Sequence, residues 1–264
     1  KKFLRFILPS FSVADSVYSR MIPNTWRTVK LIKNAIPLNL VAIETQDIHT
    51  WGRNTMKTLA EKIREARIVA VLSVNDKDAA VDLAKALADG GIKAIELTLR
   101  TPNAFECASA IAEKAHDVML GIGTVLTPEQ AVEAKKRGAD FAVSPGCNVR
   151  VIDAAKEVGL PFAPGIMTPS EIEQSLEHGC TLMKFFPAGT TGGMKHLESM
   201  AAPYKHLGVS FIPLGGLKLA NMGEYLSSPL VAAIGGSWIA PSKLIEARDW
   251  AAIRKNAEEA VAQL

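Results

Sequence analysis

A lysine inside an apolar segment is the residue of this chain whose type and position point most directly to chemistry. Lys184 stands in the middle of residues 182–186, Leu-Met-Lys-Phe-Phe. If this segment is a buried parallel strand, both of its faces are covered and the amine has no easy path to solvent. If Lys184 points inward, we expect it to lie near Arg100 in apolar surroundings. Desolvation and this neighbouring cation would favour the uncharged amine, which is a nucleophile toward ketones and forms a Schiff base with them.

Three polar residues alternate along a second apolar segment, residues 94–100. Glu96, Thr98 and Arg100 share one face of a strand, because successive side chains point to opposite sides. We expect them to face the interior, with Glu96 as the general base and Arg100 holding an anionic group of the substrate. The alternative is a structural ion pair between Glu96 and Arg100.

Two glycine pairs follow the last two predicted strands. Gly215 and Gly216 form the first pair, and Gly235 and Gly236 form the second, which Ser237 follows. In barrels of alternating strands and helices, these two loops commonly bind phosphate through backbone N–H groups. The pairs therefore predict a phosphorylated substrate.

The histidines give no sign of a metal site. His49, His116, His178, His196 and His206 are far apart and lack the spacing of metal ligands. We therefore expect neither a metal nor a cofactor. Cys147 follows a predicted strand end and either borders the pocket or fills apolar space, and the second interpretation is favoured.

From residue 67 onward, short apolar runs alternate with helical stretches. The predicted strands are residues 68–74, 94–99, 118–124, 141–144, 161–163, 182–186, 210–214 and 231–234. The predicted helices are residues 76–89, 102–115, 128–137, 149–158, 169–177, 195–202, 219–226 and 250–263. Thr-Pro pairs at 101–102, 127–128 and 168–169 predict helix starts that the threonine caps.

Eight strand–helix units predict an α/β fold, a single (β/α)8 TIM barrel over residues 56–264 with an N-terminal helix beginning near Met56. The active site of such a barrel lies at the C-terminal ends of the strands. An open doubly wound sheet is the alternative. Its glycine-rich turn after the first strand is absent here, where residues 73–76 read Ser-Val-Asn-Asp.

Composition excludes several classes of protein. The 264 residues are 48% hydrophobic and 22% charged, which is ordinary for a globular protein. No apolar run approaches the ~18 residues of a membrane span, so we expect no membrane partner. Three widely separated cysteines favour a reducing, cytoplasmic setting.

The first 55 residues differ from the rest. They carry eight Lys/Arg and three Asp/Glu, whereas the numbers of basic and acidic residues in the remainder are nearly equal. The predicted barrel therefore lacks the excess of positive charge that is typical of nucleic-acid-binding domains, and we expect no nucleic-acid partner. We consider three interpretations of this leader: an over-long start with Met56 as the true beginning, a targeting segment, or an arm that packs on the barrel or on a neighbour.

Six motifs together resemble the 2-dehydro-3-deoxy-6-phosphogluconate (KDPG) aldolases, also called 4-hydroxy-2-oxoglutarate (KHG) aldolases. The motifs are residues 95–101 (IELTLRT), 121–126 (GIGTVL), 141–146 (FAVSPG), 164–168 (PGIMT), 184–188 (KFFPA) and 235–238 (GGSW). The resemblance runs from about residue 56 to residue 264 and leaves out the leader.

The resemblance implies a metal-independent lysine Schiff-base lyase on a (β/α)8 barrel, usually a homotrimer. Its reaction would cleave the 2-oxo acid KDPG to pyruvate and glyceraldehyde 3-phosphate, in the Entner–Doudoroff route. By motif match, the resemblance assigns Lys184 as the nucleophile and Glu96 as the acid/base. Arg100 and Thr124 would bind the pyruvate carboxylate, and Pro145 and Phe186 would line the pocket. The phosphate would bind to Gly215, Gly216, Gly235, Gly236 and Ser237.

Two positions depart from the family pattern. Leu214 stands where many relatives have Thr before the first glycine pair, and Ser73 stands where some have an Arg on the first strand. These departures bear on stereochemical control and on the preference for a phosphorylated sugar. The alternatives are a KHG aldolase that yields pyruvate and glyoxylate, another pyruvate-dependent aldolase with an unphosphorylated partner, and a non-catalytic trimeric scaffold.

Overall fold

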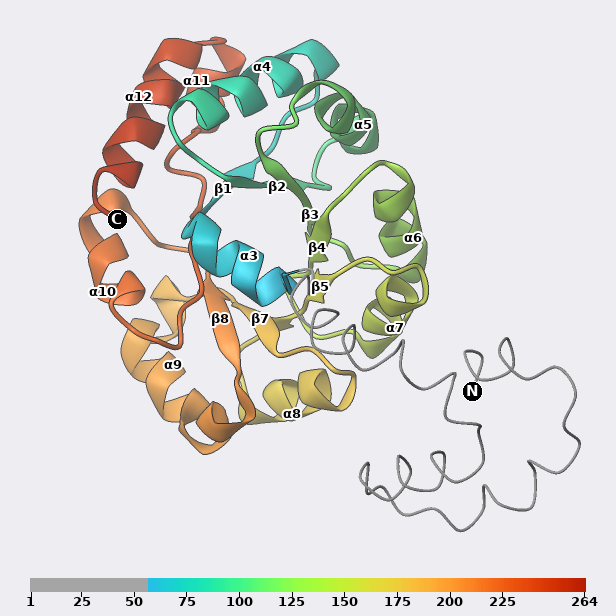
Figure 1. Cartoon of the computed structure of the whole chain (residues 1–264), viewed down its shortest axis with the longest axis vertical. Helices are drawn as coiled ribbons and strands as arrows, with labels where there is room; N and C mark the ends of the chain where they lie inside the picture. Colours follow the sequence, from blue (N-terminus) through green and yellow to red (C-terminus); the bar gives the residue numbers. More distant parts are fainter. Residues whose placement is uncertain (1–56) are drawn as a thin grey trace, which may run out of the picture. The chain divides into compact units, whose positions relative to one another are not determined.

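The computed structural model describes residues 57–264, which form an α/β unit. The leader, residues 1–55, and Met56 lie outside the described residues. Parallel strands form a curled sheet on the inside, and helices pack around its outside (Figure 1). The alternation predicted from the apolar pattern is therefore present.

The strands follow the chain around the curled sheet. They are β1 (Ile68–Leu72), β2 (Ala94–Thr98), β3 (Met119–Gly123), β4 (Phe141–Val143), β5 (Phe162–Ala163), β6 (Gly165–Ile166), β7 (Leu182–Phe185), β8 (Ser210–Pro213) and β9 (Ile234–Gly236). One group pairs in the order β5-β4-β3-β2-β1-β9 and the other in the order β6-β7-β8. An isolated parallel bridge between Leu214 and Gly235 joins the end of β8 to β9.

Two predicted strands differ from the structure. The fifth, predicted at 161–163, is two short strands, β5 and β6, on either side of Pro164, which has no N–H to donate. The Pro164 carbonyl still accepts the Lys184 N–H at 2.8 Å. The eighth, predicted at 231–234, begins only at Ile234, and Val231 makes an isolated bridge to Phe211.

Helices cover the outer face of the sheet (Figure 1). They are α4 (Lys77–Asp89), α5 (Ala104–Lys114), α6 (Pro128–Lys136), α7 (Val149–Glu157), α8 (Pro169–Glu177), α9 (Gly193–Ala201), α10 (Met222–Leu226), α11 (Ser242–Glu246) and α12 (Trp250–Val261). Three 3-10 segments, Gly189–Thr191, Ala202–Leu207 and Leu219–Asn221, also follow the strands. The sequence did not predict α11.

Two of the three predicted threonine caps are present. Thr127 and Thr168 each form a capping box, with Pro128 and Pro169 in the first turn. The prediction for Thr101 was wrong, since α5 begins at Ala104. The Thr101 hydroxyl instead donates to the Val74 carbonyl at 2.8 Å, which ties the β2–α5 loop to the end of β1.

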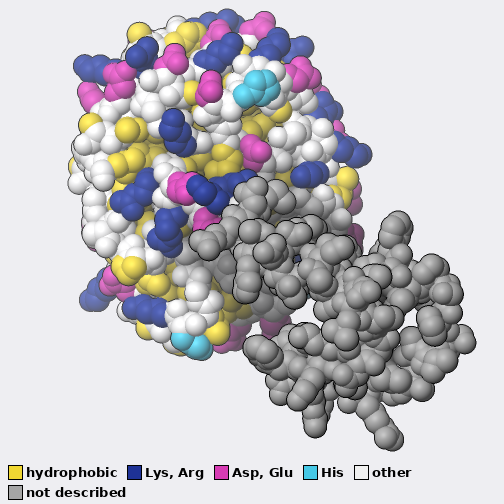
Figure 2. Space-filling view, in the orientation of Figure 1, with side chains coloured by type: hydrophobic (Ala, Val, Ile, Leu, Met, Phe, Trp, Pro, Cys, Tyr) yellow, Lys and Arg dark blue, Asp and Glu magenta, His cyan; other side chains and the backbone are white. Residues whose placement is uncertain are grey.

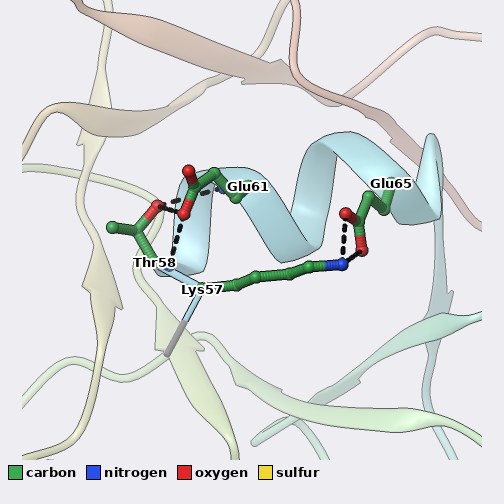
Figure 3. A network of polar contacts seen from close by, with 4 residues as sticks. All are labelled: Lys57, Thr58, Glu61 and Glu65. Carbon is green, nitrogen blue, oxygen red and sulfur yellow. Dashed lines mark hydrogen bonds and ion pairs between the residues drawn. The ribbon is translucent and has the colours of Figure 1, made fainter. Parts of the chain in front are cut away.

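Helix α3 (Leu59–Ala66) lies across the middle of the view in Figure 1. Its buried residues Ile63 and Ala66 belong to the apolar layer inside the curled sheet, together with Val69 and Ala94 near the starts of β1 and β2. A capping box starts α3, because the Thr58 backbone N–H donates to Glu61 Oε2 at 2.7 Å (Figure 3). The Lys57 ammonium pairs with the Glu65 carboxylate along the helix (Figure 3). At the other end, the Arg64 guanidinium donates to the carbonyls of Pro229 and Val231, so α3 is tied to the loop before β9.

Two apolar layers hold these elements together. The outer layer lies between the sheet and the surrounding helices. The inner layer fills the curled sheet, and Ile63 and Ala66 of α3 close it with Phe141, Leu182 and Leu214. This inner layer is mainly apolar, and the buried charged side chains within residues 57–264 are Glu96 on β2 and Lys184 on β7.

The surface shows no charged patch of a single sign on the face seen in Figure 2, where Lys/Arg and Asp/Glu side chains are interspersed. Within residues 57–264, no helix is both long and apolar enough to cross a bilayer.

Candidate active site

Lys184 and Glu96 meet inside the curled sheet. Lys184 Nζ donates to Glu96 Oε1 at 2.8 Å, and the two residues are only 4% and 2% exposed. Strands β7 and β2 aim them inward, since the flanking residues Phe185 and Leu97 belong to the outer apolar layer. Taking two charges out of water is costly unless they are paired as closely as this.

The charged group in contact with Lys184 is the Glu96 carboxylate. The sequence argument assigned Glu96 as the general base and placed the Arg100 cation near the amine. Strand β2 ends at Thr98, and Arg100 lies beyond it as an exposed side chain that makes no ion pair within residues 57–264. The carboxylate gives the ammonium proton an acceptor at hydrogen-bond distance.

Phe186 and Pro145 flank the lysine. Lys184 Nζ lies 5.5 Å from the centroid of the Phe186 ring, within the range of a cation–π contact. Pro145 lies against Gly165, which pairs with Lys184 in the register of β6 and β7. A Cβ at Gly165 would overlap the Pro145 carbonyl group, so the glycine lets the loop after β4 approach this strand.

Thr124 follows β3 with an unusual backbone. Its φ is +61°, in the left-handed region that a β-branched residue rarely adopts. Such conformations cost on the order of 1–3 kcal/mol and cluster at functional sites. Thr124 is half-buried, one residue beyond the strand that passes Glu96.

The glycine pairs lie at the ends of β8 and β9. Gly215 and Gly216 have φ values of +88° and +82°, a backbone conformation that glycine adopts readily and other residues rarely adopt. Gly235 is buried, whereas Ser237 is exposed at the same end of the sheet. The indole of Trp238 packs on Gly236. Its Nε1 is buried and has no hydrogen-bond partner within residues 57–264.

A short chain of hydroxyls links β1 to β2 beside the site. Thr98 donates to the Leu72 carbonyl at 2.8 Å, and the hydroxyls of Ser73 and Thr98 are 2.7 Å apart. Because the Thr98 proton is used for Leu72, Ser73 is the donor to Thr98. The alternation of residues 94–100 placed Thr98 inward, but nothing in the sequence predicted this link.

Cys147 lies against helix α8. Its Sγ lies 3.5 Å from the Ser175 hydroxyl, and burial raises the pKa of the Cys147 thiol. This contact agrees with the interpretation of Cys147 as a filler. No group of three or more His, Cys, Asp or Glu side chains is placed to hold a metal ion in the part of the chain that the structure describes.

The chain is also similar to known proteins. Residues 59–256 match the model of the family described as KDPG and KHG aldolase. A 2-dehydro-3-deoxy-phosphogluconate aldolase of Treponema pallidum is 43% identical over 198 residues, which cover 75% of this chain and 93% of that protein.

Two solved structures are also similar. The KDPG aldolase of Legionella pneumophila, with pyruvate captured as a covalent carbinolamine, is 35% identical with a TM-score of 0.72 and covers 76% of this chain and 97% of its own. The aldolase of Zymomonas mobilis with 3-phosphoglycerate is 33% identical with a TM-score of 0.70, covering 75% and 92%.

Proposed function

Because this chain belongs to the KDPG and KHG aldolase family, we propose that it is a lysine Schiff-base lyase that cleaves KDPG to pyruvate and glyceraldehyde 3-phosphate. The observation that carries the proposal is the buried contact of Lys184 Nζ with Glu96 Oε1 at 2.8 Å. It places a nucleophile and a proton acceptor side by side in a site closed to bulk water.

Lys184 begins the reaction. Its ammonium gives a proton to Glu96, and the free amine adds to the C2 ketone of the substrate. Glu96 then gives this proton to the hydroxyl of the resulting carbinolamine, which leaves as water. The products are a cationic imine, which draws electrons from the neighbouring carbon–carbon bond, and a Glu96 carboxylate that can accept a proton again. The covalent carbinolamine in the Legionella relative supports this order of events.

Glu96 then moves the protons of the cleavage. It removes the proton of the C4 hydroxyl, directly or through one water, and the C3–C4 bond breaks. The aldehyde leaves, and the electron pair stays on the former C3 as an enamine. Glu96 returns a proton to that carbon, and hydrolysis of the imine frees pyruvate and Lys184.

The remaining site residues bind the substrate. Arg100 and Thr124 hold the pyruvate carboxylate, and Pro145 and Phe186 form the walls beside Lys184. The backbone N–H groups of the two glycine pairs, with Ser237, receive the phosphate. The 3-phosphoglycerate in the Zymomonas relative supports a site for a phosphorylated carboxylate.

A KHG aldolase that yields pyruvate and glyoxylate is the second candidate. It is favoured by Leu214, a buried apolar side chain beside the second glycine pair, and by Ser73, whose hydroxyl is committed to Thr98. Neither residue supplies the hydroxyl or the cation that a phosphorylated aldehyde would use.

The larger organisation follows from the same family. We propose that the strands close into a complete (β/α)8 barrel over residues 56–264, that the enzyme is a cytoplasmic homotrimer, and that it uses no cofactor. The family match over residues 59–256 and the bridge between Leu214 and Gly235 support the first of these.

Borohydride trapping tests the function. We expect pyruvate with borohydride to add one reduced pyruvate to the peptide that carries Lys184, as measured by mass spectrometry. Lys184→Arg keeps the positive charge but cannot form the imine, so it is the matched control. Modification of another residue, or full turnover by Lys184→Arg, would contradict the proposal.

A further inference from the structure

Gly123, the last residue of β3, faces the acid/base Glu96 at contact distance. A Cβ on Gly123 would lie 2.6 Å from Glu96 Cγ and 2.7 Å from Cδ, and it would also overlap Oε1. Real Cβ atoms do not come this close to other heavy atoms, so any side chain at this position must displace the Glu96 carboxylate.

The backbone of β3 has little freedom to retreat from Glu96. Gly123 pairs with Thr98 in the parallel register of β2 and β3, and its carbonyl accepts the Leu99 N–H at 2.9 Å. The φ of Gly123 lies outside the left-handed range, so alanine is compatible with the backbone conformation. What the position requires is therefore space.

Space at Gly123 determines where the carboxylate can lie. Glu96 is 2% exposed and reaches Lys184 Nζ through Oε1, the oxygen that a Cβ on Gly123 would overlap. We propose that Gly123 is a positioning residue, which leaves open the volume in which the Glu96 carboxylate lies beside Lys184. This inference rests on the proposed function, in which Glu96 is the acid/base.

A double-mutant cycle in the full chain tests the inference. Its variants are Gly123→Ala, Glu96→Ala and both together. The readout is exchange of the pyruvate methyl protons in D2O by NMR, which needs both the imine and Glu96. Displacement of a catalytic group by about 1 Å costs on the order of a hundredfold, and we expect Gly123→Ala to slow exchange by that factor.

Glu96→Ala removes the atoms that Gly123→Ala would meet. In that background, we expect Gly123→Ala to change the residual exchange by less than about twofold, since the two substitutions act on one group. The melting temperature of the double variant should also match that of Glu96→Ala. An equal loss from Gly123→Ala in both backgrounds would overturn the inference and leave the proposed function intact.

Gly121→Ala is the matched control on the same strand. A Cβ on Gly121 would lie 2.5 Å from Cε2 of the Phe141 ring, and it would meet no atom of Glu96 among its three nearest contacts. Its effect on exchange and melting temperature should therefore persist in the Glu96→Ala background. If Glu96→Ala alone leaves exchange unchanged, Glu96 is not the acid/base of the proposed function. In that case Gly123 cannot act by positioning it, and the inference is overturned as well.

Discussion

The side chain of Leu214 lies over the backbone of Gly235, so that a Cβ on Gly235 would be 2.7 Å from Leu214 Cδ2. Leu214 is 4% exposed and belongs to the apolar layer inside the curled sheet, together with Phe186. Leu214, directly after β8, is thus in contact with the backbone of β9 beside the glycine pairs, where we propose that the phosphate binds.

This contact predicts the effect of Leu214→Thr. A hydroxyl here adds a donor for an anion, and a hydrogen bond to a charged group contributes about 1.5–3 kcal/mol. We expect kcat/KM for KDPG to rise about tenfold relative to kcat/KM for 4-hydroxy-2-oxoglutarate. Leu214→Val has the shape of threonine without the hydroxyl and is the control. An equal change in both variants would show that size, rather than the hydroxyl, decides the preference.

Glu96→Gln keeps the shape of the side chain but removes the proton acceptor. We expect kcat to fall by about 10²–10⁴-fold, the usual contribution of a general acid or base. Trapping of pyruvate on Lys184 should still be detectable by mass spectrometry, because the nucleophile is intact. A variant that retains full kcat would exclude Glu96 from the proton transfers.

The cysteines are expected to react slowly in the folded protein. Burial raises the pKa of Cys107 and of Cys180 to about 11 and also raises the pKa of Cys147. A two-unit rise lowers the thiolate fraction at pH 8, and with it the rate of alkylation, by about a hundredfold. Iodoacetamide labelling of folded and denatured protein, followed by mass spectrometry, measures the ratio; equal rates would contradict it.

The start of α3 should depend on pH through Glu61. Its hydrogen bonds from the Thr58 backbone and hydroxyl hold the pKa of the carboxyl below its usual value. A lowered folded-state pKa stabilises the protein above the ordinary pKa of glutamate, and this stability is lost as the pH falls through the folded value.

Thermal melts of Glu61→Gln test this dependence. The amide does not titrate, so we expect the melting temperature of the wild type to exceed that of the variant at pH 7, with the difference shrinking as the pH approaches 3. A constant difference across this range would show that ionisation of Glu61 does not matter for α3.

The sequence predicted the fold well wherever an element is defined by its own residues. The strand around Lys184 and the alternation that turns Glu96 inward follow from local apolar patterns, and β7 and β2 have them. The caps at Thr127 and Thr168 are equally local. The cap predicted at Thr101 is absent because α5 begins only at Ala104, and the Thr101 hydroxyl donates to the carbonyl of Val74, which is distant in sequence.

The contacts within the site were less accessible to sequence reasoning. Which charge lies beside Lys184 depends on where β2 ends, and Arg100 falls beyond that end as an exposed side chain. The need for glycine at 123 arises from the distance between two strands, which no pattern within β3 expresses. These relationships appear only when the register of the sheet is known.

The pairing of β1 with β9 has a consequence for how the chain acquires its structure. Residue Ile68 pairs with Ile234, and Arg64 of α3 donates to the Val231 carbonyl. During synthesis on a ribosome, one edge of β1 therefore stays open until the last strand has emerged. An exposed strand edge invites pairing with other chains, so nascent chains interrupted before residue 234 are expected to be the aggregating species.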